Sequence, residues 1–187
     1  MRVGTWTAGL VWAAASACGG GGGNGPSAAA TATPTPDPSR ASFTLQGAGY
    51  NNVVTNLTSA GGNLIFCRQE PPGPNTIWIR MAQSSAGNGE NSPHIDIDLC
   101  NFAGTSSYTR PHDTSGDRTC NQGATFAVWW HDGGREYATR PETAPCTVNV
   151  TRGTGTIEGT FECLGIPPHT GTGESIDVRA GSFRCNF

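Results

Sequence analysis

The sequence predicts an all-β fold: an antiparallel β-sandwich of seven to ten strands, stapled by disulfides, that follows a disordered N-terminal tether. Three observations predict this fold. Apolar and polar residues alternate with period 2 in several short runs, and clusters of Gly, Pro and Asn separate the runs. No run shows the i, i+3, i+4 apolar spacing of an amphipathic helix. Seven cysteines in 187 residues indicate covalent cross-links in an exported chain.

The composition excludes several classes of function. The net charge is −3, so the chain lacks the basic character expected of a nucleic-acid-binding domain, and we expect no nucleic acid partner. All eleven positively charged residues are Arg. Without any Lys, the chain cannot form a Walker A phosphate loop, a Schiff base or a Ser-Lys catalytic pair. The length suits one ordinary domain.

Residues 1–17 are predicted to be a signal peptide, because one Arg precedes a short apolar run and small residues follow it. The sequence Ala15-Ser16-Ala17-Cys18 resembles the lipobox of bacterial lipoproteins, although Ala15 stands where that family usually has Leu. The resemblance implies that Cys18 is lipidated and anchors the protein to the membrane of the cell envelope. Gly19, rather than Asp, would favour the outer membrane in a diderm bacterium. The alternative is ordinary signal-peptidase cleavage after Ala17.

Residues 18–40 are predicted to be a disordered, lipid-anchored linker. A run of five glycines begins it and a Thr-Pro repeat follows, with almost no apolar side chains to bury. Such a segment can hold a folded module roughly 25 Å from its anchor, from about 5–6 Å × √n for a flexible chain.

Residues 41–187 are predicted to form the sandwich domain. The run 94–100 is the clearest strand, since His and Asp alternate strictly with Ile and Leu. Glycine-containing turns separate the runs, as at 47–49, 132–134 and 152–155. In order, the predicted strands are 43–45, 63–67, 76–81, 94–100, 124–130, 147–151, 156–163 and 175–183.

Short motifs in this domain resemble uncharacterised bacterial envelope lipoproteins. They are Asn101-Phe102-x-Gly104-Thr105 with Tyr108, a Thr-Val-Asn-Val-Thr strand at 147–151, Gly159-Thr-Phe161 and Gly181-Ser-Phe183. The resemblance implies a β-sandwich and an envelope location, and it implies no activity.

With Cys18 lipidated, six cysteines remain for three disulfides: Cys67, Cys100, Cys120, Cys146, Cys163 and Cys185. None of them belongs to a C-x-x-C pair, which makes a zinc finger the weaker interpretation. If a two-residue turn lies at Asp132-Gly133, Cys120 falls one position from the residue opposite Cys146. We therefore expect Cys120–Cys146, and then Cys67–Cys100 and Cys163–Cys185.

Histidines and aspartates are the candidates for chemistry. His94, Asp96 and Asp98 share one face of a predicted strand, where they could present a metal or an acid/base pair. A metal-assisted hydrolase would use His94, Asp96 and a second histidine. The favoured alternative is that this strand turns its polar side to water. No catalytic motif is present, so we assign neither a catalytic residue nor a metal or cofactor.

Trp129, Trp130 and Tyr137 are the candidates for ligand binding. Adjacent strand residues face opposite sides, so one Trp is expected in the core and the other outside, where it could stack on a sugar or a protein partner. The sequence thus predicts a non-enzymatic, lipid-anchored envelope protein with an interaction or structural module. The alternatives are a surface carbohydrate-binding module and a metal-assisted hydrolase.

Overall fold

The computed structural model describes residues 37–70, 75–85, 89, 91–112, 120, 123–143 and 145–187. The expected signal peptide, Cys18 and most of the linker lie outside the described residues. Among the residues described, no helix has the length and apolar character needed to cross a membrane.

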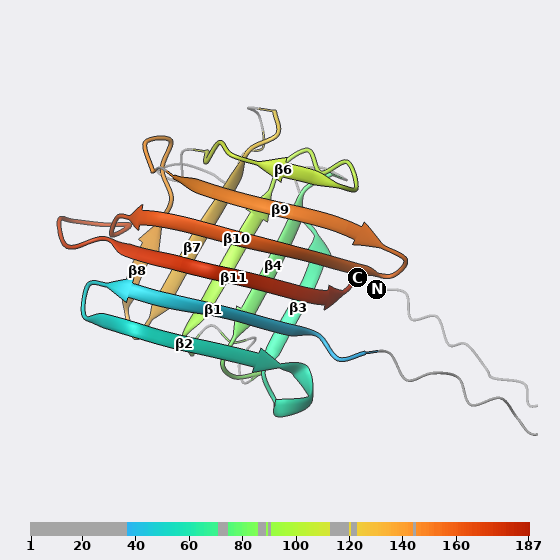
Figure 1. Cartoon of the computed structure of the whole chain (residues 1–187), viewed down its shortest axis with the longest axis horizontal. Helices are drawn as coiled ribbons and strands as arrows, with labels where there is room; N and C mark the ends of the chain where they lie inside the picture. The colour runs from blue at the N-terminus through green and yellow to red at the C-terminus, as the bar shows by residue number, and fades with distance from the viewer. Residues whose placement is uncertain are drawn as a thin grey trace, which may run out of the picture. The chain divides into compact units, whose positions relative to one another are not determined.

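The described chain forms two antiparallel sheets that pack face to face, as predicted. Figure 1 shows the strands of one sheet crossing those of the other. The six-stranded sheet has the order β2-β1-β11-β10-β9-β6, and the five-stranded sheet has the order β3-β4-β5-β7-β8. The strands are β1 Arg40–Gly47, β2 Tyr50–Thr58, β3 Leu64–Gln69, β4 Ile77–Ala82, β5 His94–Leu99, β6 Ser106–Tyr108, β7 Phe126–Asp132, β8 Arg135–Ala138, β9 Cys146–Gly153, β10 Thr156–Ile166 and β11 Ile176–Asn186.

Three of these strands, β2, β6 and β8, were not predicted as separate runs. β6 and β8 have only three and four residues. β2 is an edge strand whose residues 51–54 are all exposed, so no burial imposes an apolar alternation on it. All three strands lie at sheet edges, where pairing on one side suffices.

The core lies between the sheets, and two glycines shape it. Gly159 of β10 pairs with Phe183 of β11, and Phe161 of β10 pairs with Gly181 of β11. A Cβ atom at Gly159 would lie 2.5 Å from Cζ of Phe183, and one at Gly181 would lie 2.6 Å from Cε2 of Phe161. Each ring therefore covers the glycine of the opposite strand. The Gly-Thr-Phe and Gly-Ser-Phe motifs are the two halves of one packing unit.

Three disulfides form, but the predicted pairing was wrong. The pairs are Cys67–Cys185, Cys100–Cys120 and Cys146–Cys163. Cys67 and Cys185 lie in β3 and β11, so this bridge joins the two sheets. Cys146 and Cys163 lie directly opposite each other in β9 and β10.

The error came from the assumed hairpin register. Asp132 pairs with Arg135, so the two turn residues are Gly133 and Gly134 rather than Asp132 and Gly133. Both glycines have positive φ, 56° and 94°, the conformation that favours glycine in a two-residue hairpin turn. In addition, β7 begins only at Phe126, so the hairpin does not extend to Cys120.

Candidate functional site

The structure separates the three aromatic residues that were expected to bind a ligand. Trp130 and Tyr137 pair across β7 and β8 and belong to the core between the sheets, with 2% and 6% exposure. Trp129 faces the opposite side, where its ring lies 4.7 Å from that of His169 and is stacked with His131. The three residues therefore do not form one exposed binding surface.

The indole of Trp130 has its polar partner inside the protein. Its Nε1 donates a hydrogen bond to the Tyr50 hydroxyl (2.9 Å), and that hydroxyl donates to Asp132 (2.6 Å). Burial, together with this bond to Asp132, raises the pKa of Tyr50 to about 12. The bond from Tyr50, with help from Arg135, lowers the pKa of Asp132. Trp130 is therefore a core residue whose indole is held in place by its hydrogen bond to Tyr50.

The outward face of the five-stranded sheet is covered at β4 and β5, which contradicts the favoured interpretation of residues 94–98. His94, Asp96 and Asp98 are 3%, 0% and 5% exposed. All residues of β4 and β5 are buried, on both faces. Part of the cover is visible at Gly89, where a Cβ atom would lie 2.5 Å from the Cβ of Ala82. Because this face is covered, its charged groups need partners within the protein.

Arg80 on β4 is the main partner of Asp96 on β5. Its Nε and Nη2 atoms both donate to the Asp96 carboxylate at 2.8 Å, a bidentate pair between two buried side chains. The guanidinium also lies 4.5 Å from the ring of Trp78, and Arg68 lies 4.2 Å from the same ring. The sequence did not single out Arg80. The signal that could have found it is an Arg in an otherwise apolar strand (Ile-Trp-Ile-Arg-Met-Ala).

The second histidine of the expected polar cluster is His131. His94 and His131 are opposite each other in β5 and β7, and their rings stack with centroids 4.3 Å apart. One ligand atom of each of His94, Asp96 and His131 lies within 4.8 Å of the other two. Burial lowers the pKa of His131, and the neighbouring His94 lowers it further, against the opposing effects of Asp96 and Glu136. This environment favours the neutral imidazole.

Hydrogen bonds identify the tautomers of these two histidines. Nδ1 of His94 lies 2.7 Å from the carbonyl oxygen of Ser92, which can only accept, so Nδ1 carries the proton. Nδ1 of His131 lies 3.3 Å from a carboxylate oxygen of Glu136 and donates in the same way. In the neutral form of each ring the lone pair is therefore on Nε2, and the Nε2 of His94 lies 3.9 Å from Asp96.

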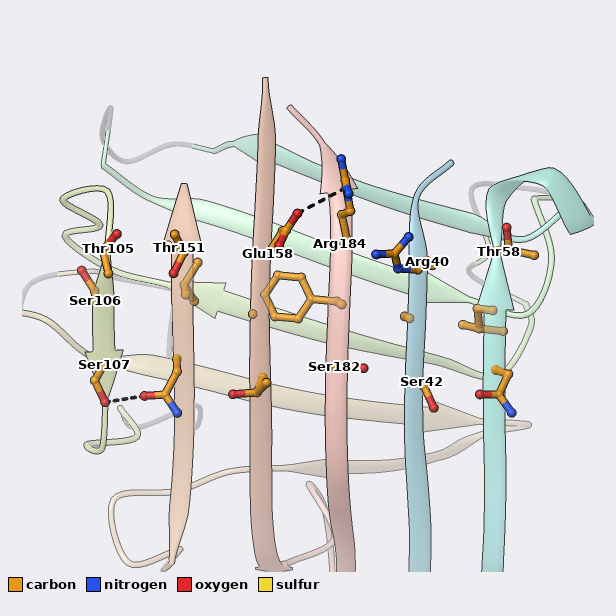
Figure 2. Close-up of a pocket in the computed structure, with 18 residues that line it drawn as sticks. Arg40, Ser42, Thr58, Thr105, Ser106, Ser107, Thr151, Glu158, Ser182 and Arg184 are labelled. Atoms are coloured by element: carbon orange, nitrogen blue, oxygen red, sulfur yellow. Dashed lines mark hydrogen bonds and ion pairs between the residues drawn. The ribbon is translucent and has the colours of Figure 1, made fainter. Parts of the chain in front are cut away.

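The outward face of the six-stranded sheet is the open face of the molecule. One row of hydroxyl and amide side chains, here called the polar row, crosses all six strands in register: Ser107, Asn149, Thr160, Ser182, Ser42 and Asn56. A second, charged row lies next to it: Thr151, Glu158, Arg184, Arg40 and Thr58. Together they line a trough of about 1000 Å³ (Figure 2).

The charges of the trough are balanced. Arg40 and Arg184 both contact Asp37 at 2.9 Å, and Arg184 lies 3.4 Å from Glu158. Two cations thus face two anions. In the polar row, the Ser107 hydroxyl donates to Asn149 at 2.6 Å, whereas the side-chain hydroxyls of Thr160 and Ser182 have no hydrogen-bond partner in the described part of the chain.

The sequence did not point to this trough, because Ser, Thr and Asn on alternating strands are ordinary surface residues until the register aligns them. No protein-family model matches the chain, and no significant match was found among curated proteins or solved structures.

Proposed function

We propose that this chain is a lipid-anchored, non-catalytic protein of the cell envelope whose sandwich domain binds a neutral glycan in the trough of the six-stranded sheet. The observation that carries the binding proposal is the polar row. Six side chains with hydroxyl or amide groups stand on six neighbouring strands, about 4.8 Å apart. The row is therefore roughly 24 Å long, which accommodates several sugar rings of an extended chain.

The chemistry of the trough favours a neutral ligand with many hydroxyl groups. Ser and Thr hydroxyls both donate and accept, as do the amides of Asn56 and Asn149, so they can match a polyol whose hydroxyls also do both. The paired charges of Arg40, Arg184, Asp37 and Glu158 give an anionic ligand no net attraction. This proposal replaces Trp129, Trp130 and Tyr137 as the binding residues.

The envelope location rests on the sequence. Residues 1–17 have the pattern of a signal peptide, Cys18 follows small residues as in a lipobox, and residues 18–40 have the composition of a flexible spacer. Metabolic labelling with a fatty acid tests this part of the proposal. We expect the wild-type chain to be labelled and Cys18→Ala to remain unlabelled, and equal labelling of the two would contradict lipid anchoring.

The binding proposal is tested with a panel of immobilised neutral polysaccharides. We expect at least one polysaccharide to retain the wild-type protein, and a Thr160→Val/Ser182→Ala variant to bind it at least tenfold more weakly. Thr154→Val is the matched control, because Thr154 lies in the exposed turn between β9 and β10, outside the trough. A silent panel, or equal binding by the trough variant, would contradict the proposal.

A further inference from the structure

We propose that His94, Asp96 and His131 bind one zinc ion on the covered outward face of the five-stranded sheet. This site is separate from the glycan trough, which lies on the other sheet, and it does not depend on glycan binding. Two observations carry the proposal: the three ligand atoms lie close together, and the hydrogen bonds at each Nδ1 leave Nε2 as the nitrogen that can bind a metal. An open cavity borders one of the three ligands, His131.

The ligand set is suited to a late transition metal. Two imidazoles and one carboxylate are a common three-residue set for zinc, with a fourth position left for water. Hard cations such as Ca²⁺ and Mg²⁺ prefer sites made of oxygen atoms. The three ligand atoms lie within 4.8 Å of one another. Zinc–nitrogen bonds of about 2.0–2.1 Å would draw them together by roughly 1 Å, which requires the stacked rings to tilt.

The groups behind each ligand hold it in the form that binds a metal. The Ser92 carbonyl accepts from Nδ1 of His94 and the Glu136 carboxylate accepts from Nδ1 of His131, so in the neutral form of each ring Nε2 keeps its lone pair. This is the arrangement that fixes the tautomer and orientation of metal-bound histidines. Asp96 is oriented by the fork of Arg80, which uses one lone pair on each carboxylate oxygen and leaves others.

Arg80 also adds a positive charge next to the site. It weakens the attraction of any cation, so the site should favour a metal that binds imidazole strongly. A cavity of about 300 Å³ is lined by His131, Glu136 and Ser92, together with the turn at Gly133 and Gly134. The His131 side chain is 22% exposed, whereas those of His94 and Asp96 are 4% and 1% exposed.

The test is zinc binding by the full chain, measured by titration against a zinc-sensitive fluorescent chelator under oxidising conditions. Every protein carries Cys18→Ser, so that its thiol cannot act as a ligand. We expect one zinc ion per chain, no competition from equimolar Ca²⁺ or Mg²⁺, and visible Co²⁺ bands typical of four coordination. Absence of zinc binding would overturn the proposal.

Variants locate the site. His131→Gln should abolish zinc binding. Glu136→Gln should weaken it between about tenfold and a hundredfold, because it replaces the carboxylate that accepts from His131 with a neutral amide. His169→Gln is the matched control: this histidine also packs on Trp129 but is not among the converging ligands, so binding should not change. Glu136 is 46% exposed, which makes its variant informative even where His131→Gln does not fold. Wild-type affinity in both site variants would overturn the assignment.

Discussion

Gly159→Ala tests the packing of the paired Gly-Phe motifs. The added methyl group would lie 2.5 Å from Cζ of Phe183 and 2.5 Å from the backbone oxygen of Asn149, where ordinary contacts begin at 3.4 Å. Overpacking of this kind costs about 1–3 kcal/mol, and we expect the upper part of that range because a backbone atom blocks one side. Restricting the unfolded chain returns about 0.4–1 kcal/mol. The net loss of unfolding free energy should be about 2 kcal/mol.

The assay is urea unfolding with the disulfides intact. For a slope of about 2 kcal/mol/M, the expected loss lowers the midpoint by about 1 M. Gly153→Ala is the matched control, because its new methyl group meets only the Thr156 hydroxyl at 2.8 Å and otherwise nothing nearer than 3.9 Å. A rotation of Thr156 relieves that contact, so its cost should stay below about 0.5 kcal/mol.

A combination with Phe183→Leu separates the ring contact from the backbone contact. The double variant should lose less than the sum of the single variants, by at least about 0.5 kcal/mol, since the smaller side chain gives the methyl group room. Equal stability of Gly159→Ala and Gly153→Ala, or strict additivity with Phe183→Leu, would refute the packing argument.

Three further predictions concern the five-stranded sheet and the disulfides. Arg80→Met should lower the free energy of unfolding in urea by about 3–5 kcal/mol, because it leaves the buried Asp96 carboxylate unpaired. Adding Asp96→Leu should restore most of this loss, and a double variant whose losses simply add would contradict the argument. Replacing Cys67 and Cys185 with Ala should lower the free energy of unfolding by about 5 kcal/mol, against about 3 kcal/mol for either of the other two pairs, which close shorter loops. A smaller loss for Cys67 and Cys185 than for the other pairs would contradict the loop-entropy argument. The pKa of His131 is lowered in the folded protein, so below the ordinary histidine pKa of 6.5 the unfolded chain binds more protons than the folded one. The free energy of unfolding of the metal-free protein should therefore fall as the pH falls through 6.5. In His131→Gln the free energy of unfolding should depend less on pH.

The fold class could be predicted because burial imposes a pattern on most of the strands. Eight of the runs identified by alternation or apolar content coincide with strands of the described chain. β2 was not predicted because its residues are exposed, and without burial on one face no alternation of apolar and polar residues is required. Val53 and Val54, for example, are 44% and 61% exposed. The Cys67–Cys185 bridge could not be predicted, because it joins strands of different sheets and depends on how the sheets pack. The Cys146–Cys163 bridge instead follows from the register of the β9–β10 hairpin.

The candidate sites were only partly predictable for a related reason. A strict alternation of His and Asp with Ile shows which side chains share a face, but not whether water or protein covers that face. The pairing of His94 with His131 depends on β5 lying beside β7, although 26 residues separate β5 from β7 along the chain. Trp129 and Trp130 were correctly expected on opposite faces, since alternation alone decides that.

The outward faces of the two sheets both carry polar side chains at alternating strand positions, but the one is covered at β4 and β5 and the other is exposed to water. On the five-stranded sheet, β4 and β5 are covered, so the buried Asp96 carboxylate needs Arg80 as its partner. A change of either polar side chain there lowers the free energy of unfolding. On the six-stranded sheet, Thr160 and Ser182 remain exposed, and a change there removes hydrogen bonds only to water. Trough variants should consequently retain wild-type stability. This separation makes ligand binding measurable on one face without disturbing the charged cluster on the other.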